Sequence, residues 1–187
     1  MKVVVIGDTQ VGKTCIVTRL INGAFSEDMN ATIGAAFQTA TVVTETSTVS
    51  LQIWDTSGQE KYRALAPMYY QGSKAALLCF DITSQISFKS AERWYDELMM
   101  KAPQNIKVVL VGNKSDLEEK REVSKEEAEN FVQKHNLPFY IECSAKTGDN
   151  VSNLFQKVAE FQKKFGDRSE NATIKVIDDV QTKKKCC

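Results

Sequence analysis

The stretch VVVIGDTQVGKT, residues 3–14, decides the fold that the sequence predicts. Its first four residues are apolar and β-branched, a run typical of a central parallel strand that is buried on both faces. Residues 7–14 match the pattern G-x-x-x-x-G-K-[ST]. A helical spacing of apolar residues follows, from Lys13 to Asn22. A buried strand, a glycine-containing loop and a helix in this order predict the first unit of an α/β sheet.

The loop between that strand and that helix has the chemistry of a phosphate-binding site. Its glycines let several backbone N–H groups point inward at an anion, and the start of the following helix favours negative charge. Lys13 is expected to reach the outer phosphates of a nucleotide, and the Thr14 hydroxyl is expected to bind Mg²⁺. The alternative, a tight turn without a ligand, is disfavoured because both flanking elements are present. The residues of this loop expected to bind phosphate are Gln10, Val11, Gly12, Lys13, Thr14 and Cys15.

Strands and helices alternate along the rest of the chain. Further strands are expected over 36–45, 48–55, 75–82, 106–114 and 137–145, and helices over about 86–101, 124–135 and 150–165. This alternation predicts a mainly parallel sheet with helices on both faces, in which ligands bind at the carboxyl ends of the strands. Residues 1–165 are expected to form one folded domain, and residues 166–187 a flexible tail, because the periodicity fades there.

The composition excludes several classes of protein. The chain has 187 residues and a formal net charge of zero, which argues against general nucleic-acid binding. No apolar run approaches the roughly 18 residues that cross a bilayer, and the N-terminal residues do not resemble a signal peptide. Five cysteines do not make a disulfide scaffold in a chain of this length. We therefore expect a cytosolic protein with reduced thiols.

The tetrapeptide NKSD, residues 113–116, follows the buried run 106–112 and predicts a reader of guanine. Asp116 can accept hydrogen bonds from the adjacent N1–H and amine of guanine, whereas adenine presents a lone pair at N1. A site built for such donors rejects an analogue that lacks them by roughly 10⁴-fold or more. Lys114 is expected to lie along the base, and Asn113 to connect this loop to the phosphate loop. Alone, the tetrapeptide also fits a solvated polar turn.

Two further motifs complete the predicted site. The sequence SAK, whose residues are Ser144, Ala145 and Lys146, follows the last expected strand and would close the base pocket. DTSGQE, residues 55–60, ends an earlier strand. In it, Asp55 is placed to hold the Mg²⁺ shell through water, Gly58 to approach a γ-phosphate and Gln59 to orient an attacking water. Thr32 is expected to supply a second hydroxyl to Mg²⁺.

GDTQVGKT, ATIG, WDTSGQE, NKSD and ECSAK, in this order, resemble the Ras superfamily of small GTPases. IGAAF, LQIWDTSGQEKYRALAPMYYQG and the terminal Cys186-Cys187 are similar to its Rab branch, and ATIGAAF and LAPMYY to the early-endosomal subgroup. The resemblance covers residues 2–165. It implies a P-loop GTPase fold whose six-stranded sheet has one antiparallel strand. It also implies a monomeric switch that binds GDP or GTP with Mg²⁺, hydrolyses GTP slowly and regulates vesicle traffic.

The resemblance also implies roles for residues outside the nucleotide motifs. Phe25 would cover the guanine, and residues 26–36 and 56–71 would be two switch loops ordered by the γ-phosphate. An aromatic set would meet effectors, although core packing is an alternative for its tryptophan. That set comprises Phe37, Trp54 and Tyr69. An exchange factor, a GTPase-activating protein, a prenyl-transfer escort and a GDP-dissociation inhibitor are the other implied partners.

Two residues depart from the family pattern. Ser57 stands where the family usually has alanine, and its hydroxyl is small enough to keep the loop while altering water placement. Gln10 takes a place often held by a smaller residue, and its side chain either crowds the phosphate or lies outward.

The ending KKKCC, residues 183–187, does not fit the rules for a zinc site or a C-a-a-X box, and a disulfide is improbable in a reducing cytosol. By the resemblance, Cys186 and Cys187 form a double geranylgeranylation site that anchors the protein to the cytosolic face of endosomal or vesicle membranes. Two lipids give stable anchoring where one does not, and the three lysines add about 1 kcal/mol each on anionic lipid. An unmodified tail is the alternative.

Two other functions compete with the switch. A scaffold that binds GTP without turnover is disfavoured by Gln59, and an ATP-using P-loop kinase is disfavoured by NKSD.

Overall fold

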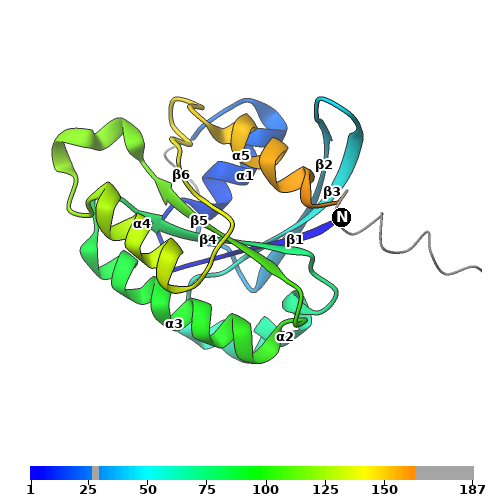
Figure 1. The fold of residues 1–187 in the computed structure, drawn as a ribbon, viewed down its shortest axis with the longest axis horizontal. Helices are drawn as coiled ribbons and strands as arrows, with labels where there is room; N and C mark the ends of the chain where they lie inside the picture. The colour runs from blue at the N-terminus through cyan, green and yellow to red at the C-terminus, as the bar shows by residue number, and fades with distance from the viewer. Residues whose placement is uncertain (27–29, 163–187) are drawn as a thin grey trace, which may run out of the picture.

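A six-stranded sheet runs through the centre of the molecule in the order β2-β3-β1-β4-β5-β6 (Figure 1). The computed structural model describes residues 1–26 and 30–162. The strands are β1 (Lys2–Ile6), β2 (Ala35–Val43), β3 (Thr48–Thr56), β4 (Ala75–Asp81), β5 (Lys107–Asn113) and β6 (Tyr140–Glu142). The α-helices are α1 (Lys13–Asn22), α2 (Ala66–Tyr70), α3 (Gln85–Lys101), α4 (Lys125–Lys134) and α5 (Val151–Ala159). Two 3₁₀ segments are η1 (Glu60–Leu65) and η2 (Ser115–Lys120).

The predicted fold class is confirmed. β2 pairs antiparallel with β3, and every other neighbouring pair in the sheet is parallel. Helices α1 and α5 cover one face, and α2, α3 and α4 cover the other (Figure 1). The last four residues of β1 are fully buried: Val3 and Val5 belong to the core of the first face, and Val4 and Ile6 to that of the second. The run of β-branched residues that starts the chain therefore has the central place that its composition predicts.

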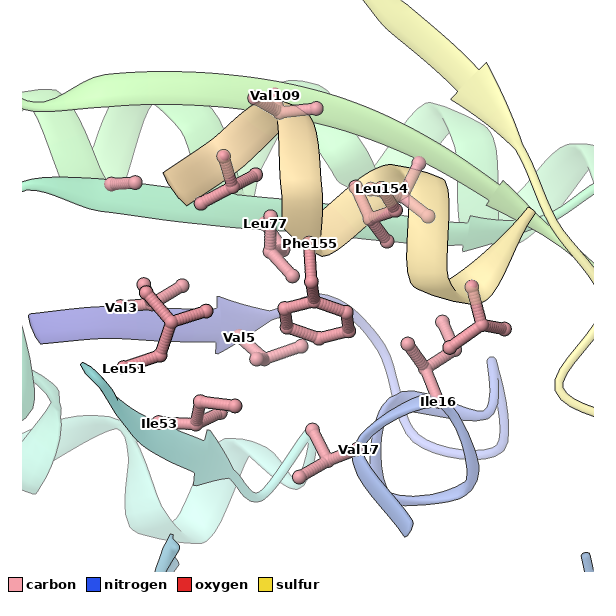
Figure 2. Close-up of a cluster of buried hydrophobic side chains, with 14 of the residues drawn as sticks. Val3, Val5, Ile16, Val17, Leu51, Ile53, Leu77, Val109, Leu154 and Phe155 are labelled. Carbon is pink, nitrogen blue, oxygen red and sulfur yellow. The ribbon is translucent and has the colours of Figure 1, made fainter. Parts of the chain in front are cut away.

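The core of the first face holds the helix after the phosphate loop in place. Phe155 of α5 lies among side chains of the sheet and α1, all fully buried (Figure 2). Ile16 and Val17 are the α1 residues in this cluster. Burying a side chain of this size stabilises the fold by about 1.5–3 kcal/mol. The packing thus fixes the helix start that faces the ligand.

The last strand differs most from the sequence prediction. The strand expected over 137–145 is shorter, because Pro138 lacks an N–H and the Ser144 N–H turns away to the Asp149 carbonyl, 3.0 Å away. α5 spans Val151–Ala159 with Glu160 as its C-cap, residues 161 and 162 are again helical, and the end expected at residue 165 lies outside the described residues. The expected boundary between domain and tail, at residue 165, lies outside the described residues.

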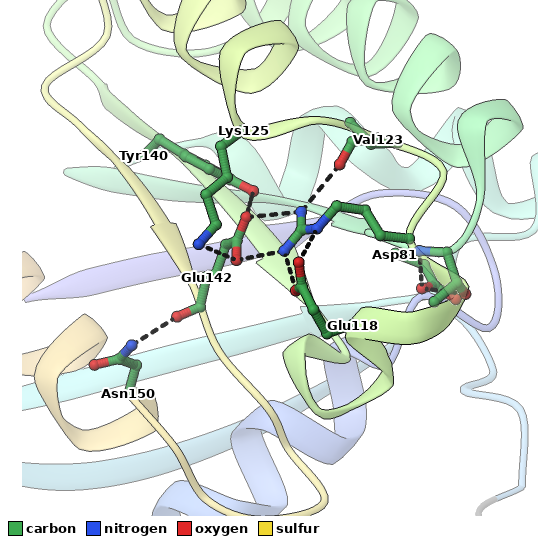
Figure 3. Close-up of polar contacts among 9 residues, drawn as sticks. Asp81, Glu118, Val123, Lys125, Tyr140, Glu142 and Asn150 are labelled. Carbon is green, nitrogen blue, oxygen red and sulfur yellow. Dashed lines mark hydrogen bonds and ion pairs between the residues drawn. The ribbon is translucent and has the colours of Figure 1, made fainter.

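A polar network fixes β6 to the segment after NKSD (Figure 3). Arg121 donates through Nη1 and Nη2 to the Glu142 carboxylate at 3.0 and 2.8 Å, and through Nε to Glu118 at 2.8 Å. The Tyr140 hydroxyl donates to Glu142 at 2.7 Å, and burial raises the pKa of that hydroxyl. Bidentate arginine–carboxylate pairs are among the strong polar contacts. The network holds the two loops that follow β5 and β6 in a fixed relation.

Candidate functional site: a nucleotide cavity

A cavity of about 600 Å³ opens at the carboxyl ends of the parallel strands. Most of the residues that the motifs single out line it: Gln10, Gly12, Lys13, Thr14, Cys15, Phe25, Thr32, Gly58, Asn113, Lys114, Asp116, Ala145 and Lys146. Val11, Asp55, Gln59 and Ser144 do not line it directly. The cavity also takes in residues that were not among the predicted binding residues: Thr9, Ser26, Asn30, Ala31, Thr56, Ser57 and Leu117. Thr9 lies inside the glycine-lysine pattern, at a position that the pattern leaves unspecified.

The phosphate loop is held by bonds of its own. Lys13 is 6% exposed, and its Nζ donates to the carbonyls of Gly7 and Asp8 at 2.9 and 2.7 Å. Burial lowers the pKa of the Lys13 ammonium, which a nearby anion would counteract. Asp8 is held in turn, because its carboxylate accepts from the indole N–H of Trp94 on α3 at 2.8 Å. The loop is therefore tied to a helix of the opposite sheet face.

Gln10 carries a left-handed backbone with a φ of 63°. A non-glycine residue in this region is uncommon and marks local strain. The residue is exposed and lines the cavity.

Three oxygen-bearing side chains meet at the phosphate end of the cavity. The Thr14 hydroxyl donates to Asp55 Oδ2 at 2.6 Å and lies 2.8 Å from the Thr32 hydroxyl. Asp55 Oδ1 is buried and has no hydrogen-bond partner among the described residues. Burial raises the pKa of Asp55, although bonds from the two threonines oppose the shift. Mg²⁺ takes oxygen ligands and is commonly held by one or two carboxylates with waters and substrate phosphates. The donor set and the unpartnered oxygen fit this ion.

The segment that begins the second predicted switch lies against the phosphate loop. A Cβ on Gly58 would stand 2.3 Å from Asp8 C and Thr9 N, so only glycine fits there. The Gln59 side chain is partly exposed and does not reach the cavity, so the structure does not place this residue at the predicted point of attack. The backbone N–H of Gln59 donates to the Ser57 hydroxyl at 3.2 Å. The residue that departs from the family pattern thus contacts the backbone of the predicted catalytic residue.

The base end of the cavity is a closed set of hydrogen bonds. Asn113, 2% exposed, donates to the Val11 carbonyl at 2.8 Å and accepts from the Ala145 N–H at 3.1 Å. The expected connection between the NKSD loop and the phosphate loop is therefore present. Asp116 Oδ1 accepts from the Ser144 hydroxyl at 2.5 Å, which aligns the carboxylate.

Two side chains flank this base end. The Lys114 ammonium pairs with Asp81 at 2.5 Å, a partner at the end of β4 that motif reasoning did not identify. The sequence DIT, which begins with Asp81, matches no nucleotide-binding motif considered from the sequence. Phe25 is partly buried, packs against the core of the first face and lines the cavity.

The predicted aromatic set comes together on the surface. The ring centroids of Phe37 and Trp54 are 5.3 Å apart, and those of Trp54 and Tyr69 are 5.7 Å apart. Phe37 is 52% exposed and Trp54 is partly buried, so the tryptophan packs and also faces outward. Ile33, 79% exposed, adds apolar surface from the segment before β2. We call Ile33, Phe37, Trp54 and Tyr69 the aromatic patch.

The fold and the two ends of the cavity define a class of protein, the P-loop GTPases. A family model described as the Ras family matches residues 2–164, and the chain belongs to that family. It is 46% identical to Ras-related protein RABF2a of Arabidopsis thaliana over 159 residues, which is 85% of this chain and 79% of the relative. It is 45% identical to Ras-related protein Rab5 of Nicotiana tabacum over 159 residues, again 85% and 79% of the two chains. It is 48% identical to Ras-related protein Rab-11A of Dictyostelium discoideum over 157 residues, 84% of this chain and 73% of the relative.

The resemblance to the Rab branch is thereby confirmed. The protein is a Rab-type small GTPase that binds guanine nucleotide, hydrolyses GTP and acts as a switch in membrane traffic.

Within residues 1–26 and 30–162, none of the helices has the length and apolar character to cross a bilayer. The expected lipidation site, Cys186 and Cys187, and the lysines before it lie outside the described residues.

Proposed function

We propose that the residues gathered around the cavity bind GTP with Mg²⁺ and that this binding switches the shape of the aromatic patch. The observation that carries the proposal is the pairing of two different ends in one cavity. One end holds the Thr14, Asp55 and Thr32 oxygens, and the other holds Asp116, aligned by Ser144.

At the phosphate end, the chain's own residues would position the nucleotide. The Lys13 ammonium would exchange its two carbonyl partners for phosphate oxygens, as a buried cation gains more from an anion than from a neutral acceptor. Thr14, Thr32 and, through water, Asp55 would hold Mg²⁺. The ion, when bound, neutralises charge on the transferred phosphate. Thr32 precedes β2, so its engagement fixes the segment that leads into the aromatic patch.

At the base end, Asp116 would accept from the two adjacent N–H groups of guanine. The Ala145 N–H is already used by Asn113, and the Ala145–Lys146 segment would close over the base edge. Phe25 would cover the ring. Selection against adenine follows because the Asp116 carboxylate repels the lone pair at N1.

Hydrolysis would depend on Gln59 orienting a water, after a movement that brings its side chain into the cavity. No arginine is among the described residues that line the cavity, so the intrinsic reaction is slow and a partner protein supplies the missing cation. The same partner contact would order Gln59.

The membrane side of the function rests on resemblance. Cys186 and Cys187 would carry geranylgeranyl groups, and the aromatic patch would bind effectors in the GTP state. The relatives named Rab5 and Rab-11A have similar identities to this chain, so the endosomal membrane is proposed from the motifs ATIGAAF and LAPMYY, which resemble the early-endosomal subgroup.

Titration of nucleotide-free protein with mant-GDP and mant-ADP, with Mg²⁺ and with EDTA, tests this proposal. We expect mant-GDP to bind at least about 10⁴-fold more tightly than mant-ADP. EDTA should weaken binding of mant-GDP, since Mg²⁺ held by Thr14 would neutralise charge on the phosphates. Comparable binding of both nucleotides, or binding indifferent to EDTA, would overturn it.

A further inference from the structure

Arg19, in the last turn of α1, makes three hydrogen bonds to backbone carbonyls. Nε donates to the Ala145 carbonyl at 2.8 Å, Nη2 donates to the Lys146 carbonyl, and Nη1 donates to the Gly23 carbonyl at 2.6 Å. The guanidinium is partly buried and does not line the nucleotide cavity. Its planar set of donors matches carbonyls arranged on two sides of it.

These carbonyls belong to the two walls of the base end. Ala145 and Lys146 follow β6 and line the cavity. Gly23 ends α1 and precedes Phe25 by two residues, and Phe25 lines the cavity from the other side. Arg19 therefore connects the segment after β6, which closes the base end, with the segment after α1 that carries Phe25.

Ordinary helix capping does not account for this arrangement. An arginine near a helix C-terminus commonly donates to the last carbonyls, and the bond to Gly23 is of this kind. The bonds to Ala145 and Lys146 join residues separated by 126 and 127 positions. Asn113 accepts from the Ala145 N–H and Asp116 from the neighbouring Ser144 hydroxyl, so Arg19 adds bonds to the carbonyls of the same segment.

A packing feature supports the same assignment. A Cβ on Gly148, which has a φ of 89°, would lie 3.5 Å from Cδ of Arg19. The loop after Lys146 thus turns closely over the arginine side chain. Charged hydrogen bonds to carbonyls contribute more than neutral ones, so this clamp resists opening of the base end.

We propose that Arg19 is a positioning residue that sets how long a guanine nucleotide stays bound, because it holds both walls of the base end closed. The proposal rests on the proposed function, in that guanine occupies this end of the cavity. Arg19 acts on release of the base and not on the chemical step, since its partners lie away from Thr14, Asp55 and Gln59.

The test measures nucleotide release and hydrolysis in the same preparations. Full-length wild-type protein, Arg19→Ala and Arg19→Lys are loaded with mant-GDP and chased with excess GDP, with Mg²⁺ and again with EDTA. Arg93→Ala is the matched control, since Arg93 donates to Ser90 within α3 and lies outside the cavity. Single-turnover hydrolysis of pre-loaded GTP is measured on each protein.

We expect Arg19→Ala to release mant-GDP roughly 10- to 100-fold faster, since two charged bonds across the loop are lost. Arg19→Lys should release faster by a smaller factor, because an ammonium keeps the charge but not the planar fork. The ratio of the variant to the wild-type release rate should be the same in EDTA as in Mg²⁺, because EDTA acts at the phosphate end of the cavity. Hydrolysis of bound GTP should stay within about twofold of wild type, as should both rates in Arg93→Ala.

A wild-type release rate in either Arg19 variant overturns the proposal. So does a change of release and hydrolysis by equal factors, which would indicate a general loosening of the domain. Failure of the proposed function gives a different result, namely wild-type protein that binds mant-ADP as well as mant-GDP.

Discussion

The two ends of the nucleotide cavity are built in opposite ways. At the base end, Asn113 is bonded to Ala145 and Asp116 to Ser144, so the protein's own groups hold both side chains in place. At the phosphate end, the Lys13 ammonium is bonded to carbonyls of its own loop, and one oxygen of Asp55 has no partner among the described residues.

This difference separates recognition from switching. A preorganised set binds without reorganisation, which favours affinity and selectivity. A set with substitutable bonds and an unsatisfied carboxylate is more stable with its ligand than without it. Loss of a phosphate then changes the conformation near Thr32 while the base stays held. Variants at either end of the cavity test this separation, and their expected effects run from the largest to the smallest.

Removing the base reader should have the largest effect. Asp116→Ala should weaken binding of GDP by about 10⁴-fold, because the two guanine donors and the Ser144 hydroxyl lose their common acceptor. Equilibrium titration with mant-GDP measures the loss. Glu129→Gln, on an exposed part of α4, is the control and should bind as wild type. A loss of less than tenfold would contradict the assigned role of Asp116.

Removing the predicted water-orienting group should affect only the phosphate end. Gln59→Leu should slow single-turnover hydrolysis of GTP by about 10²-fold, the effect of misplacing a reacting group. Release of mant-GDP should not change, since Gln59 lies away from the base-end network. A variant that hydrolyses at the wild-type rate would remove Gln59 from the mechanism, and one that also releases GDP faster would break the separation of the two ends.

Neutralising the buried carboxylate should stabilise the metal-free protein. The folded-state pKa of Asp55 is raised by burial, so the native state binds this proton more tightly than the unfolded state does. The corresponding stability is present at low pH and is lost as pH rises through the raised pKa. Asp55→Asn should therefore raise Tm in EDTA and excess GDP at pH 7 by about 2–4 °C.

The same variant should lose its response to the ion. Thermal unfolding with Mg²⁺ should raise Tm of the wild type and leave Asp55→Asn nearly unchanged. In EDTA, the wild type should gain Tm at low pH through protonation of Asp55, and Asp55→Asn should lack this gain. A variant that is less stable than wild type in EDTA would show that the carboxylate is already satisfied without a ligand.

Removing the Ser57 hydroxyl should have the smallest effect. Ser57→Ala breaks a bond to the Gln59 N–H, a neutral contact worth about 1 kcal/mol, so intrinsic hydrolysis should slow by about two- to fivefold. Single-turnover kinetics measure this, with Ser73→Ala as the control, since the Ser73 hydroxyl lies after α2 and donates to the Tyr69 carbonyl. Faster hydrolysis in Ser57→Ala would mean that the hydroxyl obstructs the water instead of ordering the loop.

Local patterns predicted the fold and most cavity residues. The helix expected over 13–22 coincides with α1, because the apolar spacing and the loop before it are both local signals. The antiparallel edge strand came from family resemblance and not from periodicity. The strand predicted over 137–145 is longer than β6, because apolar residues continue on both sides of Tyr140–Glu142.

Contacts between distant segments had no such signal. The pairing of Lys114 with Asp81, and the reach of Arg19 to the loop after β6, depend on how the sheet brings strand ends together. Neither residue type nor spacing marks them. The position of Gln59 outside the cavity could not be predicted from the sequence either, because one switch sequence adopts more than one conformation.

The hydrogen bond between Trp94 and Asp8 gives this protein a built-in optical reporter. The chain has two tryptophans, Trp54 in the exposed aromatic patch and Trp94 bonded to the phosphate loop. The fluorescence of Trp54 should therefore respond to changes at the surface, and that of Trp94 to changes at the phosphate loop. Emission of Trp54→Phe protein would follow loading of the cavity, and that of Trp94→Phe protein would follow docking on the patch, both without an added dye.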